Sequence, residues 1–224
     1  MPTIAITGSN RGIGLELCRQ FLARGDNVIG ICREATDAMP ALGVEAITGI
    51  DVSDDGSVAT LQNALGNRPI DVLINNAGIM GREKLPELDW EGIRRQFEIN
   101  SLGPLRVTAA LLDNLNRDAK IAIVTSRMGS IVDNTSGGGY GYRMSKAAVN
   151  IAGVSLARDL ADRSVAVLMV HPGSVRTDLT ASVMSAGQGI DVEESASGII
   201  ARIDELTVET TGRFMHAKGE PLPW

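Results

Sequence analysis

The residues Thr3-Ile-Ala-Ile-Thr7 lead directly into Gly8-Ser-Asn-Arg-Gly12-Ile-Gly14, and these lead into an amphipathic segment. The apolar run predicts a strand, and Ile13, Leu17 and Phe21 recur at the spacing of one helix face. A glycine-rich turn from strand to helix leaves backbone N–H groups and the positive helix end free to bind an anion such as a pyrophosphate. The spacing G-x-x-x-G-x-G has a longer first gap than the common dinucleotide motif, and a merely tight turn would explain these glycines equally well.

Short apolar runs and longer helical patterns alternate along the rest of the chain as well. We expect strands at Thr3–Thr7, Asn27–Ile31, Val44–Thr48, Ile70–Asn75, Lys120–Ser126, Ser164–Val170 and Gly212–His216. We expect helices at Gly12–Arg24, Asp54–Leu65, Leu88–Asn116, Tyr142–Ala161 and Val192–Glu205. Several strands, such as Ile121–Val124, are apolar on both faces, which is typical of a parallel sheet covered by helices. Without a linker or an internal repeat, the pattern predicts an α/β fold, a doubly wound sheet in a single domain over residues 1–224.

Composition and charge argue against several classes of binding site. A net charge of -6 argues against binding to duplex nucleic acid, which requires a concentrated basic face. Cys18 and Cys32 are not in a C-x-x-C pair, so we expect two reduced thiols. No leader pattern occurs at the N-terminus and no apolar run approaches the ~20 residues of a membrane span, so we expect a soluble, cytoplasmic protein without a membrane partner. The two histidines, His171 and His216, show no metal-ligand spacing, and we expect no metal site.

The residues at the end of the second expected strand indicate which cofactor the glycine-rich turn would bind. Cys32-Arg33-Glu34 stands there, and Arg33 follows Gly14 by 19 residues. NAD-binding proteins usually place a carboxylate near this point for the ribose 2′-hydroxyl, whereas a guanidinium favours a 2′-phosphate. Arg11 in the glycine-rich turn can approach the same phosphate. We therefore expect NADP(H) to be preferred; Glu34 keeps NAD(H) as an alternative, and the two arginines as solvated surface residues are another.

Polar and small residues follow other strands. Asp51-Val52 comes after the third expected strand and Asn75-Asn-Ala-Gly78 after the fourth, at the sheet edge where doubly wound folds bind ligands. After the sixth strand, Pro172-Gly173 redirects the backbone and Thr177 can hydrogen-bond a nicotinamide carboxamide. His171 is interpreted as a structural turn residue.

Tyr142 and Lys146 are four residues apart, so on a helix they share a face. An ammonium beside the phenol would lower its pKa from about 10 towards the range useful for proton transfer. Ser126, at a strand end, can hydrogen-bond a substrate carbonyl. Asn100 could hold a water that links Lys146 to solvent, or it could be a helix-bending residue satisfied by backbone. A lone Tyr-x-x-x-Lys pair occurs readily by chance, so only its context makes it a candidate site.

In this order, the glycine-rich turn, Asn75–Gly78, Asn100, Ser126, Tyr142/Lys146 and Pro172-Gly173 resemble the short-chain dehydrogenase/reductase superfamily. The resemblance implies a Rossmann fold with strand order 3-2-1-4-5-6-7 and an Asn100–Ser126–Tyr142–Lys146 tetrad. It also implies contacts of Asp51 with adenine, of Asn75 with the nearby ribose side and of Thr177 with the carboxamide. The full set of expected cofactor-binding residues is Gly8, Asn10, Arg11, Gly12, Ile13, Gly14, Arg33, Asp51, Val52, Asn75, Asn76, Ala77, Gly78, Tyr142, Lys146, Pro172, Gly173, Val175 and Thr177.

Within the superfamily, the glycine-rich turn, Ser126–Ile131 and Gly141–Asn150 are similar to C-factor/sniffer-like carbonyl reductases. This implies NADPH-dependent reduction of an aldehyde or ketone to an alcohol, with hydride from nicotinamide and the proton from Tyr142. The alternative is a cofactor-binding signalling protein of C-factor type with incidental turnover. The resemblance also implies a homodimer or homotetramer. The expected substrate region, about 178–191, is short and carries no motif for one substrate.

Overall fold

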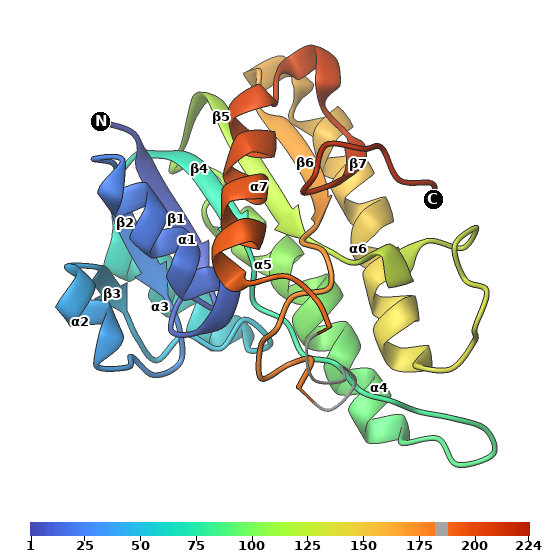
Figure 1. Ribbon diagram of the computed structural model, residues 1–224. Helices are drawn as coiled ribbons and strands as arrows, with labels where there is room; N and C mark the ends of the chain where they lie inside the picture. The colour runs from blue at the N-terminus through green and yellow to red at the C-terminus, as the bar shows by residue number, and fades with distance from the viewer. Residues whose placement is uncertain (182–187) are drawn as a thin grey trace.

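Seven parallel strands form one sheet in the computed structural model, which describes residues 1–181 and 188–224. The strands follow the order β3-β2-β1-β4-β5-β6-β7, as the resemblance implied (Figure 1). Their bounds are β1 Thr3–Thr7, β2 Asn27–Ile31, β3 Glu45–Ile47, β4 Ile70–Asn75, β5 Leu115–Val124, β6 Ala166–His171 and β7 Arg213–His216. The chain reverses its direction of winding between β1 and β4, so their carboxyl ends flank the crevice in which such sheets bind ligands.

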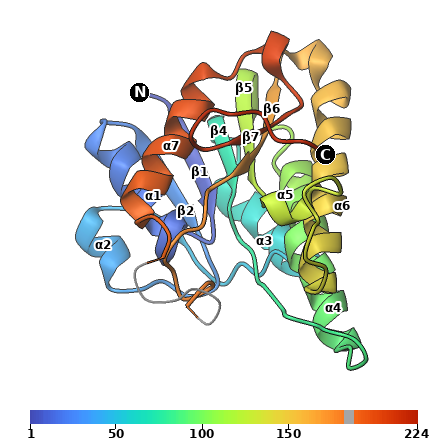
Figure 2. The same ribbon diagram turned by 45° about the vertical axis from the view of Figure 1, so that its right-hand side comes forward.

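Helices cover both faces of the sheet (Figure 2). One face packs against α1 Gly12–Ala23, α2 Ala38–Leu42 and α7 Val192–Glu205. The other packs against α3 Asp55–Leu65, α5 Gly103–Ala110 and α6 Tyr140–Asp159, with α4 Trp90–Phe97 extending away from the sheet beside α6. A π-helical turn, η1 Glu98–Leu102, joins α4 to α5, and short 3-10 turns lie at η2 Arg127–Gly129, η3 Ala161–Arg163 and η4 Val208–Thr210.

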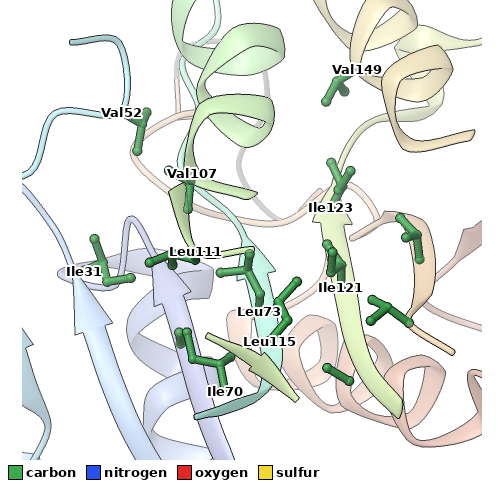
Figure 3. Close-up of a cluster of buried hydrophobic side chains, with 14 of the residues drawn as sticks. Ile31, Val52, Ile70, Leu73, Val107, Leu111, Leu115, Ile121, Ile123 and Val149 are labelled. Atoms are coloured by element: carbon green, nitrogen blue, oxygen red, sulfur yellow. The ribbon is translucent and has the colours of Figure 1, made fainter. Parts of the chain in front are cut away.

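The central strands are buried on both sides, as their continuous apolar sequence predicts. Leu73 and Ile121 point into the core under α5 and α6, where Figure 3 shows them with Val107 and Val149. The next residue along β4, Ile74, points into the other core, under α1 and α7. Each fully buried side chain of this size contributes roughly 1.5–3 kcal/mol, so the two cores hold the strand ends in fixed positions.

The expected helix Leu88–Asn116 is wrong as a single element. The chain runs through α4, η1 and α5, turns after Ala110, and enters β5 at Leu115, five residues before the expected strand start. Leu115 pairs with Ile70, and a register shift follows on the way to Val72. Asp118 has a positive φ of 65° in this stretch. Pairing with β4 therefore extends the N-terminal end of β5 through exposed polar residues. The same residues are also compatible with a helix, so the local sequence does not identify them as a strand.

Other differences are confined to element ends and one short helix. Helix α2 was not expected, and Asp54 caps α3 by accepting a hydrogen bond from the Ser57 N–H instead of lying in the helix. Helix α6 begins at Tyr140, two residues earlier than expected, and β6 runs through His171. Ser126 lies just beyond β5, which ends at Val124.

Three findings concern membrane-spanning helices, metal sites and disulfides. None of the helices in the described residues combines the length and apolar character needed to cross a bilayer. Within 1–181 and 188–224, no three His, Cys, Asp or Glu side chains are grouped as a metal site would require. Cys18 and Cys32 are buried, free thiols.

Candidate functional site

A cleft opens along the carboxyl ends of the strands, and most of the expected cofactor-binding residues line it. Those that do are Gly8, Asn10, Arg11, Gly12, Ile13, Arg33, Asp51, Val52, Asn76, Ala77, Gly78, Tyr142, Lys146, Pro172 and Thr177. The cleft also has walls that motif reasoning missed: Ile31, Cys32, Ile50, Ile79, Ile99, Val124 and Thr125. Several of these are the last apolar residue of a strand or its neighbour, a position that the strand assignments could have flagged. Asp178 and Leu179, which also line the cleft, belong to the expected substrate region. Residues 182–187 of the expected substrate region lie outside the described residues.

Four of the expected cofactor-binding residues stand behind the cleft lining. A Cβ at Gly14 would lie 2.1 Å from the Gly8 carbonyl oxygen, so this glycine allows the turn to close on itself. Asn75 is buried and its Nδ2 donates to the Thr108 hydroxyl at 3.2 Å. Val175 is buried, and Gly173 has a φ of 92° with Ile190 packed against it. Through backbone shape or packing, these four residues support the cleft without lining it.

The glycine loop, Gly8–Gly14, presents backbone donors to the cleft. Helix α1 begins at Gly12, and its N-cap residue Arg11 makes no side-chain cap hydrogen bond. Asn76 holds the loop against the end of β4, because its Nδ2 donates to the Thr7 and Gly8 carbonyls at 3.0 and 3.1 Å. The N–H groups of the first helical turn and the positive helix end are therefore oriented for an anion.

Basic groups surround the far end of the cleft. The Asn10 Nδ2 donates to the Glu34 carbonyl at 2.9 Å, which keeps the segment after β2, including Arg33, beside the glycine loop. Arg11 forms an exposed ion pair with Asp178 at 3.1 Å, an interaction weak enough to be exchanged for a ligand. Hydrogen bonds from Ser53 lower the pKa of Asp51, and the charge of Arg33 acts in the same direction. This end therefore combines an ionised carboxylate with two guanidinium groups.

At the other end, which we call the reactive end, Tyr142 and Lys146 are almost completely buried. The Lys146 Nζ donates to the Val124 carbonyl at 2.9 Å and lies 5.8 Å from the centre of the Tyr142 ring. Burial lowers the pKa of Lys146 to about 8. Burial raises the pKa of Tyr142, and a hydrogen bond with the Ser126 side chain opposes that increase. Desolvation, and not the neighbouring cation that the sequence suggested, is thus the largest influence on the phenol, which stays protonated at neutral pH.

Asn100 lies in the π-helical turn η1 and joins it to two other segments. Its Oδ1 accepts from the Ile79 N–H at 2.9 Å, and its Nδ2 donates to the Ile79 carbonyl at 2.9 Å and to the Ser145 hydroxyl at 3.0 Å. The Ser101 hydroxyl donates to the Ser145 carbonyl at 2.8 Å. The side chain is thus hydrogen-bonded to backbone and to Ser145 inside an irregular helical turn, and it fixes α6 against the segment after β4. These bonds do not choose between a water-holding and a helix-bending role.

The turn η2 brings Ser126 to Tyr142. The Ser126 Oγ accepts from the Met128 N–H at 3.1 Å, and the turn then packs directly on α6. A Cβ at Gly129 would lie 2.7 Å from the backbone carbonyl carbon of Lys146. Only a glycine therefore permits this approach, which holds the serine and the two α6 side chains in one rigid group.

Comparisons with known proteins agree with this arrangement. The model of the short chain dehydrogenase family matches residues 2–188. The 1-hydroxy-2-glutathionyl-2-methyl-3-butene dehydrogenase of Rhodococcus sp. (strain AD45) is 43% identical over 226 residues, covering 100% of both chains. C-signal of Myxococcus xanthus is 44% identical over 159 residues, which cover 70% of this chain and 93% of that protein.

A solved structure agrees in fold as well as in sequence. A carbonyl reductase from Pseudomonas aeruginosa PAO1, in complex with NADP, superposes with a TM-score of 0.81 at 31% identity over 100% of both chains. The resemblance to C-factor-like carbonyl reductases is thereby confirmed. The chain belongs to the short-chain dehydrogenase family, and it is an oxidoreductase that acts on CH–OH and C=O groups.

Proposed function

We propose that the protein binds NADP(H) in the cleft and catalyses the reversible reduction of an aldehyde or ketone to an alcohol. One observation carries this proposal: the buried Tyr142 and Lys146 line the same cleft as the glycine loop, and the Ser126 hydroxyl lies near the Tyr142 phenol. This arrangement supports a proton donor beside a site suited to a dinucleotide.

The donors along the cleft fit NADP(H). The glycine loop and the N-terminus of α1 would hold the pyrophosphate, and Arg11 and Arg33 would hold the 2′-phosphate. Lys146 would bind the ribose hydroxyls beside the nicotinamide, whose carboxamide would meet Thr177. The NADP complex of the related P. aeruginosa carbonyl reductase supports this choice of cofactor. When bound, NADPH supplies the hydride that the carbonyl carbon accepts.

The residues of the reactive end would act on the carbonyl oxygen. The Ser126 hydroxyl would donate a hydrogen bond that polarises the C=O group, and the Tyr142 Oη would transfer its proton to that oxygen. The raised pKa of Tyr142 keeps the phenol in the proton-donating form. In the reverse direction the phenolate would accept the alcohol proton, and the buried ammonium of Lys146 would stabilise it.

The two curated relatives bear on substrate and role. The name of the Rhodococcus protein describes a dehydrogenase for a hydroxylated glutathione conjugate, so alcohol oxidation with NADP⁺, including a glutathionylated alcohol, belongs in the assay. The similarity to C-signal favours a second candidate, a cofactor-binding signalling protein in which turnover is incidental. The full set of Ser126, Tyr142 and Lys146 at one site supports the enzyme, because a binding protein has no need of a proton donor.

The test compares the chain's two tyrosines, Tyr140 and Tyr142, which lie on the same helix. Tyr142→Phe should bind NADPH normally and lose most of its turnover, roughly a hundredfold or more, because only the proton donor is removed. Tyr140→Phe removes a hydroxyl one half-turn away and should keep wild-type turnover. A Tyr142→Phe protein that turns over carbonyls at the wild-type rate would refute the enzymatic proposal.

A further inference from the structure

The helix that carries Tyr142 and Lys146 does not cap its own beginning. Helix α6 starts at Tyr140, and its N-cap residue Gly139 has a φ of 57° and no side chain to accept a hydrogen bond. The acceptors come instead from Glu83, 58 residues before Gly141 in the sequence. Its backbone carbonyl accepts from the Gly139 N–H at 2.9 Å, and its Oε2 accepts from the Gly141 N–H at 3.0 Å. A distant residue thus satisfies donors that a local cap normally satisfies.

Glu83 is itself fixed by α4. It is 6% exposed, and its Oε1 accepts from the Gln96 Nε2 at 2.5 Å. The Gln96 Oε1 in turn accepts from the Gly81 N–H at 2.7 Å. We call Gly81, Glu83, Gln96 and Gly141 the Glu83 clasp. It joins three segments: the stretch after β4, helix α4 and the first turn of α6.

The clasp leaves no space for larger residues. A Cβ at Gly81 would lie 2.2 Å from the Glu83 Oε1, and a Cβ at Gly141 would lie 2.4 Å from the Gln96 Nε2. A carboxylate among N–H donors at the positive end of a helix is favoured by the helix dipole. Burying a carboxylate costs more free energy than a helix cap contributes. Helix capping alone therefore does not explain why the Glu83 carboxylate is buried at this position.

Tyr142, the residue next to the clasp, suggests a better explanation for the buried carboxylate. Gly141, whose N–H the carboxylate holds, directly precedes Tyr142 in the first turn of α6. Lys146 is one turn further on and has separate anchors, since its Nζ bonds Val124 and the adjacent Ser145 bonds Asn100. Tyr142 keeps one bond to this anchored end, because its carbonyl accepts from the Ser145 hydroxyl at 2.9 Å. Loss of the Glu83 carboxylate would therefore loosen the turn at Gly141 and Tyr142 and leave the Lys146 end of the site in place.

We infer that Glu83 is a positioning residue: through the Gly141 N–H it fixes the first turn of α6 so that the Tyr142 phenol meets the substrate carbonyl. This inference rests on the proposed role of Tyr142 as proton donor. It assigns to Glu83 an effect on the chemical step and none on cofactor binding. A misplacement of the donor by about 1 Å is enough to slow such a step a hundredfold.

The experiment compares Glu83→Ala, Glu83→Gln and Glu87→Ala, the last an exposed glutamate of the same segment. Turnover is expressed per NADPH-binding site, counted by fluorescence titration. Glu83→Ala should lower kcat roughly ten- to a hundredfold with unchanged NADPH affinity. Glu83→Gln should recover most of kcat, because its amide oxygen still accepts from the Gly141 N–H. It should nevertheless melt at a lower temperature than wild type, because its amide NH₂ meets that of Gln96. Glu87→Ala should match wild type.

Amide hydrogen exchange provides a readout that does not depend on turnover. In Glu83→Ala, exchange should accelerate at Gly141 and Tyr142 and stay slow from Val149 onwards. The inference is overturned if kcat per site in Glu83→Ala equals that of wild type, if kcat and NADPH affinity fall together, or if Glu83→Gln is no better than Glu83→Ala. Wild-type protein that binds NADPH but reduces no carbonyl would instead overturn the proposed function, and the inference with it.

Discussion

Arg33 is the side chain at which the choice between the two nicotinamide cofactors can be tested. It lines the cleft beside Asp51, at the end of β2 where a carboxylate would favour an unphosphorylated ribose. A charge-assisted hydrogen bond contributes about 1.5–3 kcal/mol, so Arg33→Ala should raise the KM for NADPH by roughly ten- to a hundredfold. The KM for NADH should change little, and steady-state kinetics with both cofactors measure the difference.

Arg117→Ala is the matched control for that prediction, because it removes the same charge from an exposed position near the start of β5. Its KM for NADPH should equal that of wild type. Equal KM values for NADPH in Arg33→Ala and wild type would show that Arg33 is a solvated surface residue, the alternative that the sequence left open.

Asn100 shows what single-residue reasoning cannot resolve. The sequence allowed a water-holding residue or a helix-bending residue satisfied by backbone, and no local pattern chooses between them. The π-helical turn and the paired hydrogen bonds to Ile79 become visible only when β4 and α6 are placed around the side chain. Glu83 was missed for a related reason: its partners, Gln96 and Gly141, are distant in sequence and belong to no motif.

At the scale of elements, the contact of η2 with α6 predicts that a single substitution at this contact lowers both stability and turnover. A Cβ at Gly129 would lie 2.7 Å from the Lys146 carbonyl carbon and 2.9 Å from its Cβ, and backbone atoms of a packed helix cannot give way cheaply. Gly129→Ala should therefore destabilise the protein by about 1–3 kcal/mol. Because the same contact sets Ser126 against Tyr142, kcat should also fall. Urea unfolding and steady-state kinetics measure the two effects.

Gly56→Ala in α3 is the matched control, since its added Cβ would meet no atom closer than 3.4 Å and the residue is exposed. Alanine in an exposed helix should stabilise the protein by up to about 1 kcal/mol relative to glycine. A Gly129→Ala protein as stable as Gly56→Ala would mean that η2 and α6 separate easily.

The elements that sequence patterns predicted well are those whose burial alone determines them. Strands β1, β2 and β4 and helix α7 have the predicted bounds because their apolar runs or stripes end where the core ends. The stretch from Leu88 to Asn116 failed because its helical spacing continues past the point where β5 begins pairing with β4. Pairing between strands distant in sequence is invisible in a local pattern.

At the scale of the whole molecule, the expected site residues meet because parallel strands bring their carboxyl ends to one edge. The expected residues from Gly8 to Thr177 are spread over most of the chain, in groups that follow β1, β2, β3, β4 and β6, with Tyr142 and Lys146 on α6. The order of these residues therefore predicted that most of them would line one cleft. The substrate side could not be predicted, since it depends on loops whose course no strand dictates.

The same edge makes the fold sensitive to acid. His171 ends β6 beside His216 of β7, with ring centres 4.9 Å apart, and burial first, then His216 and Arg127, lower the pKa of His171 from 6.5 to about 3. Between these values the unfolded chain binds a proton that the folded protein excludes, so the free energy of unfolding falls as pH falls below 6.5.

The substitution His171→Phe removes the pH-dependent contribution of His171 to stability. In urea unfolding at about pH 7 and pH 4.5, the variant should lose less stability on acidification than wild type, by about 2 kcal/mol. Carboxylate protonation affects both proteins alike and cancels in the comparison. Equal losses would mean that the folded protein admits the proton at His171 and that the junction of β6 and β7 is open to water.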